Sequence, residues 1–86
     1  MVNYKIQISA SAEKSLKKIP TKDVLKLIQV MQALAANPRP VGARKLAGEE
    51  NTYRVRQGSY RVIYELKDYV LLILVLKIGH RKDIYR

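Results

Sequence analysis

The stretch YRVRQGSYRVIYEL, residues 53–66, decides the fold, because apolar and polar residues alternate on both sides of its central Gly58-Ser59. Alternation with a period of two is typical of half-buried strands. A two-residue loop that begins with glycine is typical of a tight hairpin. The stretch therefore predicts two antiparallel strands, and the length of the loop places Arg56 directly opposite Arg61.

The sequence on either side of this hairpin predicts two more strands. After a turn at Lys67-Asp68, residues 69–78 form a nearly continuous apolar run. Such a run is typical of a strand that is covered on both faces and lies inside a sheet. Residues 2–9 alternate and predict a first strand, which we place beside the apolar run.

Between the first strand and the hairpin, apolar residues at spacings of three and four predict two helices separated by Pro20. Ser9 or Ser11 can cap the first helix and Thr21 the second, since hydroxyl side chains accept hydrogen bonds from free amide groups there. Asn37-Pro38 ends the second helix. Residues 38–51 hold two prolines and two glycines and predict a loop.

The predicted order is β-α-α-β-β-β, an α+β fold formed by residues 1–86 as a single domain. We expect the helical hairpin to pack on one face of a small, mostly antiparallel, four-stranded sheet. The expected core comprises ten side chains from both layers: Ile6, Ile8, Leu16, Leu27, Ile28, Met31, Val62, Tyr64, Ile73 and Val75.

The amino-acid composition limits the classes of function that this protein can have. The 86 residues include 17 basic and 7 acidic side chains, for a net charge of +10. Such a charge favours a polyanionic partner: nucleic acid, an acidic protein or an anionic membrane. The absence of cysteine excludes disulfides and thiolate zinc sites. The sequence shows no carboxylate pairs at metal-binding spacing, so we expect no metal, and we expect a cytoplasmic protein without a membrane span.

The arginines of the hairpin are the main functional signal. Like charges directly opposed across two strands are destabilising, and Arg54 adds a third charge to the face of Arg56 and Arg61. A guanidinium group grips phosphate oxygens with two hydrogen bonds, so the pattern predicts an anion site. The alternative is a splayed, hydrated edge without a ligand.

The C-terminal segment adds a titratable imidazole, further cations and one aromatic ring: His80, Arg81, Lys82, Tyr85 and Arg86. A ring beside cations is a common way to hold an unstacked RNA base. A basic tail that is merely solvated is the alternative interpretation.

Four segments in this order resemble the RelE/ParE superfamily of toxins from toxin–antitoxin pairs. They are SASAEKSLKKIP (9–20), ARKLAG (43–48), the hairpin stretch, and VLLILVLKIGHRKDIYR (70–86). The arginine and tyrosine positions are similar to the RelE-like branch. That resemblance implies a ribosome-dependent mRNA endoribonuclease that inhibits translation without metal or cofactor. It also implies an acidic RelB-like antitoxin as partner, besides ribosome and mRNA. A ParE-like gyrase inhibitor and a basic RNA-binding module remain alternatives.

The same resemblance assigns roles to residues. The family's catalytic positions fall on Arg54, Arg56, Arg61, Arg81 and Tyr85. Candidates for RNA binding or proton transfer are His80, Lys82, Arg86 and Lys45. Known members carry lysine where this chain has Arg54 and Arg56. Because arginine stays protonated, the resemblance leaves His80 and Tyr85 as the candidates to carry protons.

Overall fold

The computed structural model describes residues 3–80 of the chain. Two helices and five strands follow one another, with a single 3-10 turn between the last two strands. Their bounds are β1 Lys5–Ile8, α1 Ala10–Lys17, α2 Thr21–Ala36, β2 Arg44–Lys45, β3 Thr52–Gln57, β4 Tyr60–Lys67, the turn Asp68–Val70, and β5 Leu72–His80.

The strands form one sheet in the order β1-β5-β4-β3-β2. β1 runs parallel to β5, and the other pairs are antiparallel. The expected α+β fold and the placement of β1 beside β5 are confirmed. The expected number of four strands is wrong, because Arg44–Lys45 pairs with β3 inside the segment that we expected to be only a loop. Two residues are too short to show any alternation.

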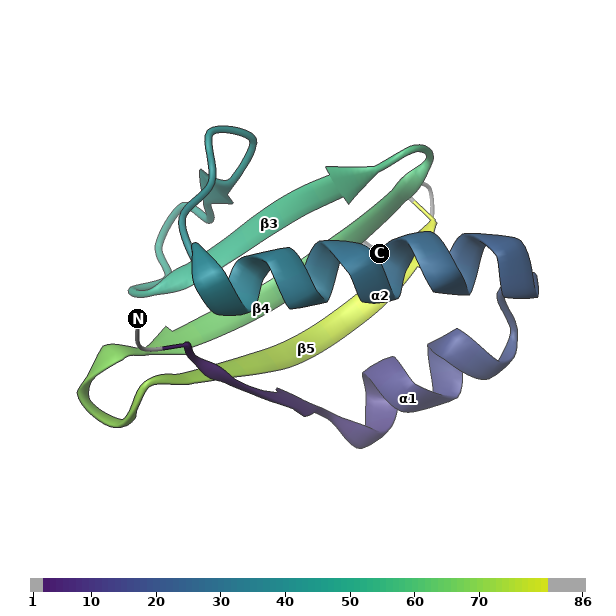
Figure 1. Ribbon diagram of the computed structural model, residues 1–86. Helices are drawn as coiled ribbons and strands as arrows, with labels where there is room; N and C mark the ends of the chain where they lie inside the picture. Colours follow the sequence, from purple (N-terminus) through teal and green to yellow (C-terminus); the bar gives the residue numbers. More distant parts are fainter. Residues whose placement is uncertain (1–2, 81–86) are drawn as a thin grey trace.

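Both helices lie on one face of the sheet (Figure 1). The hydroxyl of Ser9 accepts a hydrogen bond from the amide of Ala12 at 3.1 Å, which caps α1, and donates one to the carbonyl of Leu76 at 2.8 Å. One serine thus starts the helix and ties it to β5. The expected cap of α2 is wrong, since Pro20 takes the cap position and Thr21 is the first helical residue.

The core lies between α2 and the sheet. Leu27, Met31 and Leu34 of α2 are buried against the strand residues. The buried strand residues are Val55, Val62, Tyr64, Leu66, Ile73, Val75 and Ile78. Of the expected core, Ile6, Ile8 and Leu16 are only partly buried at its margin. Ile28 was expected in the core, but it is 38% exposed, because Leu27, Met31 and Leu34 face the sheet and Ile28 lies on the flank.

The apolar run differs from its expected form in two ways. Tyr69, Val70 and Leu71 belong to an exposed turn rather than to a strand, and Leu71 has a left-handed backbone with φ of 53°. β5 is also not covered on both faces. Its buried residues are Ile73, Val75 and Ile78, and the residues between them are at least partly exposed, since the helices cover a single face. Hydrophobicity alone does not reveal either feature. No helix within residues 3–80 is long and apolar enough to cross a membrane.

Candidate nucleic-acid interface

The hairpin between β3 and β4 positions the predicted arginine pair. Gly58 has a φ of 60° at the first position of the loop, a conformation that glycine adopts without steric cost. The resulting register places Arg56 opposite Arg61, as the sequence predicted. Val55 and Val62 are part of the core. Because side chains alternate along a strand, both arginines lie on the face that the helices leave uncovered.

A fourth arginine joins this face through β2. The register of β2 and β3 places Arg44 directly opposite Arg54. An open groove of about 310 Å³ is lined by residues of both strands: Gly42, Arg44, Arg54, Val55 and Arg56. Arg44 escaped the sequence analysis because the pairing of a two-residue strand leaves no periodic pattern. We call Arg44, Arg54, Arg56 and Arg61 the arginine face.

The positive charges of the arginine face have no acidic partner among the described residues. Within residues 3–80 the recorded ion pair is that of Arg39 with Asp68, and no carboxylate lies within 4.0 Å of a guanidinium nitrogen of the arginine face. Arg61 is only 8% exposed, and its buried Nε has no hydrogen-bond partner among residues 3–80. A buried donor without an acceptor is costly. An anion bound here would therefore satisfy a group that the described part of the chain leaves unsatisfied.

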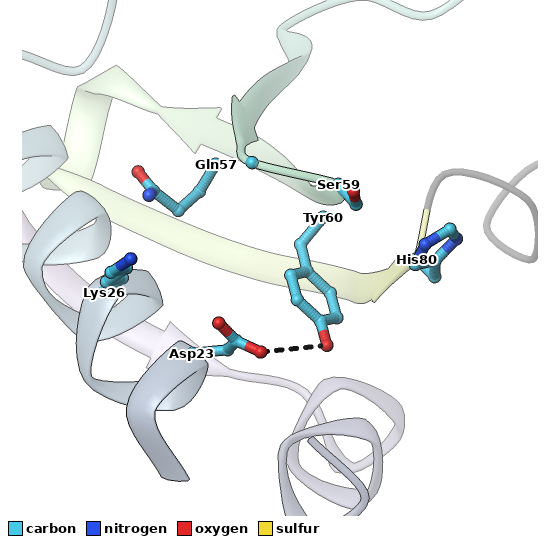
Figure 2. Close-up of a pocket in the computed structure, with 7 residues that line it drawn as sticks. Asp23, Lys26, Gln57, Ser59, Tyr60 and His80 are labelled. Carbon is cyan, nitrogen blue, oxygen red and sulfur yellow. Dashed lines mark hydrogen bonds between the residues drawn. The ribbon is translucent and has the colours of Figure 1, made fainter. Parts of the chain in front are cut away.

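His80 lies on the other face of the sheet. It pairs with Tyr60 in the register of β4 and β5, and the two rings meet edge to face with centroids 6.0 Å apart. The Tyr60 hydroxyl donates to Oδ2 of Asp23 on α2 at 3.4 Å. Burial, and then the Asp23 charge, raise the pKa of the Tyr60 phenol. These side chains help to line an open pocket of about 290 Å³ at the tip of the hairpin (Figure 2).

The structure therefore separates the predicted site residues into groups. Arg54, Arg56 and Arg61 lie together, while His80 belongs to the next register pair and the opposite face. Lys45 pairs with Tyr53, whose ring stacks on the core residue Tyr64, so Lys45 takes a register position on the helix side. The other predicted positions lie outside the described residues: Arg81, Lys82, Tyr85 and Arg86.

The chemistry available on the arginine face is charge stabilisation. A guanidinium group donates hydrogen bonds and keeps its proton at all useful pH values, so these residues can hold phosphate but cannot act as bases. Within residues 3–80 no three histidine, cysteine or acidic side chains gather closely enough to hold a metal ion.

Comparisons with known proteins identify the family of this chain. Residues 6–85 match the family model described as the ParE toxin of type II toxin-antitoxin systems, parDE. The chain belongs to this RelE/ParE family of toxins. Toxin RelG of Mycobacterium tuberculosis is 31% identical over 96% of this chain and 97% of its own length. The expected family is thus confirmed.

Solved structures of RelE/ParE toxins have the same fold. In the archaeal RelE–RelB complex from Pyrococcus horikoshii, one chain superposes with a TM-score of 0.83 at 28% identity, covering 94% of this chain and 98% of that one. The RelBE2 toxin-antitoxin complex from Mycobacterium tuberculosis gives 0.80 at 24% identity, covering 93% and 100%. The first of these proteins was solved with RelB, and the second as a toxin-antitoxin complex.

Proposed function

We propose that this RelE/ParE toxin is a ribosome-dependent endoribonuclease that cuts mRNA in the cytoplasm and so inhibits translation. The observation that carries the proposal is the directly opposed pair of Arg56 and Arg61, in which the buried Nε of Arg61 has no partner within the described chain. A fold maintained with this electrostatic cost is best explained by a bound phosphate group, which offsets the cost.

The proposed reaction is an in-line attack of the 2′-oxygen of RNA on the adjacent phosphorus. The new bond closes a 2′,3′-cyclic phosphate, and the bond to the 5′-oxygen breaks, which leaves a 5′-hydroxyl end. Negative charge grows on the phosphoryl oxygens during the attack. Arg56 and Arg61 would stabilise this charge, and Arg54 would strengthen the positive field around it. Holding the nucleotide in line would supply a further part of the rate.

Two protons must move in this reaction, one from the 2′-hydroxyl and one to the leaving 5′-oxygen. The arginine face cannot carry them. His80 directly follows the register pair of Arg61 and Gly79, but its side chain lies on the opposite face of the sheet from the arginine face, so we assign it no proton transfer. We propose Tyr85 as proton carrier and Arg81 as the group that stabilises the leaving oxygen, as the family resemblance implies.

We further propose an acidic antitoxin that covers or distorts the arginine face. The net charge of +10 would attract an acidic chain over a long distance, and the association should weaken with salt. The deciding experiment is co-expression with any small acidic protein that is encoded beside the gene. Relief of growth inhibition is expected, and continued inhibition would rule out that partner.

The test of the enzyme uses purified protein and ribosomes programmed with a defined message. We expect cleavage in the ribosomal A site and fragments that end in a 2′,3′-cyclic phosphate. Arg61→Ala should abolish most of the cleavage. Arg39→Ala is the matched control, because it removes an arginine that already has a carboxylate partner at 2.7 Å. Fragments that end in a 3′-hydroxyl would contradict the proposed mechanism.

A second candidate is inhibition of DNA gyrase, which the ParE name of the matching family model favours. Assays with purified components distinguish the two functions. Inhibition of gyrase supercoiling by a protein that leaves the message on programmed ribosomes intact would replace the ribonuclease proposal.

A further inference from the structure

The arginine face is arranged as two pairs rather than as one diffuse patch. Arg44 is opposite Arg54 across β2 and β3, and Arg56 is opposite Arg61 across β3 and β4. Side chains directly opposite each other start about 5 Å apart, so two guanidinium groups of a pair can reach the same phosphate. The two pairs share β3, which contributes one arginine to each.

The offset between the pairs is fixed by β3. Arg54 and Arg56 are two residues apart in one strand, which separates them by about 6.6 Å along it. This offset is close to the distance between successive phosphates of an extended RNA strand. The groove runs from the pair of Arg44 and Arg54 to Arg56 of the other pair, and a Cβ atom added at Gly42 would meet no atom of the described residues within 4 Å apart from its chain neighbours.

We propose that Arg44 and Arg54 form a second phosphate subsite, which binds the phosphate next to the one held by Arg56 and Arg61. This proposal deepens the proposed function, on which it rests, by defining how the RNA backbone crosses the sheet. The second subsite binds and aligns the strand. Arg44 is therefore a binding residue, and the reacting phosphate stays with the other pair.

An acidic protein segment is the competing ligand for the same face. RNA is favoured by the geometry, because planar guanidinium forks in pairs match phosphates that repeat at a fixed interval. Carboxylates along a peptide have no such fixed interval. The groove also leads away from Arg56 along the uncovered face, toward the edge strand β2, so a single strand can continue past it.

The experiment measures affinity against the number of phosphates, using 2′-O-methyl oligouridylates that cannot be cleaved. The dimer, trimer and tetramer carry one, two and three phosphates. For the unmodified protein, the gain in affinity from one to two phosphates should exceed the gain from two to three. Arg44→Gln should lower the first gain roughly two- to fivefold, the range of an exposed ion pair. It should also reduce the salt dependence of trimer binding by about 0.7 in log–log slope.

The matched control is Lys22→Gln, which removes one positive charge from an exposed position of α2, on the other side of the sheet. It should keep the gain from one to two phosphates. Arg44→Lys, which keeps the charge and loses the fork, should lie between the two. An unchanged gain in Arg44→Gln, or an equal loss in Lys22→Gln, would overturn the subsite and leave only a diffuse positive field.

Two further results distinguish a failure of the second phosphate subsite from a failure of the ribonuclease proposal. The oligonucleotide measurement needs neither ribosomes nor cleavage. If the gain depends on Arg44 while programmed ribosomes show no cutting, the ribonuclease proposal fails and the subsite stands. If Arg44→Gln weakens binding of a hexaglutamate peptide but leaves trimer binding unchanged, Arg44 binds an acidic protein and the RNA subsite is overturned.

Discussion

The two ends of the β3–β4 hairpin both carry arginine, but they treat its charge in opposite ways. At the open end, Arg39 donates to Asp68 at 2.7 Å and to the Tyr53 hydroxyl at 3.1 Å, and its guanidinium group lies 5.5 Å from the centre of the Tyr53 ring. At the turn end, Arg61 is buried and its Nε has no partner among the described residues. Satisfied charge indicates a structural role, and unsatisfied charge indicates a ligand.

The carboxylate at the open end shows how complete this satisfaction is. Asp68 accepts hydrogen bonds from Arg39 and from the Tyr4 hydroxyl, and both hold its pKa below the ordinary value of 3.8. The same Asp68 contact raises the pKa of Tyr4. The cluster joins Tyr4, which directly precedes β1, to the loop after α2 and to the turn before β5. The charged groups of this cluster pair with one another, whereas those of the arginine face are available to a bound partner.

The largest effect on cleavage is expected from a substitution at the turn end of the hairpin. Arg61→Met keeps most of the buried length of the side chain and removes the charge. We expect cleavage on programmed ribosomes to fall about 10²–10³-fold, the loss of one preorganised donor. We also expect the free energy of unfolding to stay the same or to rise, because the unsatisfied donor is removed. Single-turnover cleavage and urea unfolding measure the two effects.

A fall in stability that accompanies the fall in cleavage would contradict the interpretation of Arg61 as a functional group. Arg39→Met is the control at the open end. It should lower stability because it leaves Asp68 without its cation, and it should leave cleavage unchanged.

The sequence predicted the turn end better than the rest of the site. A glycine-led two-residue loop determines register, so the opposition of Arg56 and Arg61 followed from local chemistry alone. Arg44 did not follow, because its place depends on a two-residue strand that tertiary pairing creates. The separation of His80 from the arginines also depends on the register of β4 and β5, which no local pattern encodes.

The fold shows the same limit. Alternating and helical periods predicted β1, both helices and the hairpin. The apolar run was misjudged at its start, because Tyr69, Val70 and Leu71 are apolar and yet form an exposed turn. Ile28 was misjudged because the apolar stripe of α2 is wider than the strip that contacts the sheet. Which part of a stripe is buried depends on how the helix packs, and the sequence does not contain that information locally.

The second-largest effect tests whether the backbone conformation of Gly58 sets the register of the hairpin. Gly58→Ala places a side chain at φ of 60°, and a left-handed backbone costs about 1–2 kcal/mol for such a residue. We expect unfolding free energy to fall by that amount, and cleavage to fall as well, because the turn sets the opposition of Arg56 and Arg61. Gly58→Asn should lose less of both, since asparagine tolerates positive φ. Equal losses in the two variants would contradict this role.

The third effect concerns stability at the open end of the hairpin, where Tyr64 contacts the loop after α2. Tyr64 is buried and its hydroxyl donates to the carbonyl of Pro38 at 2.8 Å. Tyr64→Phe should cost about 1 kcal/mol of unfolding free energy and leave cleavage unchanged. Burial, with a smaller contribution from Tyr53, raises the pKa of Tyr64 to about 12.

That pKa shift gives the same variant a pH signature. Because the folded pKa is raised, the stability from this phenol is complete below the ordinary value of 10.0 and is lost as pH rises from there to about 12. The difference between the unmodified protein and Tyr64→Phe should therefore shrink in alkaline urea unfolding. A difference that stays constant over this range would contradict the assignment.

The smallest effect concerns Asp68, which is exposed and therefore screened by solvent. Its folded pKa is lowered, so its contribution to stability is present above the ordinary value of 3.8 and is lost as pH falls through the lowered value. Asp68→Asn should be slightly less stable than the unmodified protein at neutral pH and equal to it in strong acid, while cleavage at neutral pH stays unchanged. Urea unfolding across the acid range measures the convergence. If Asp68→Asn instead impairs cleavage, the two ends of the hairpin are functionally coupled, and the division between a structural and a ligand-binding end fails.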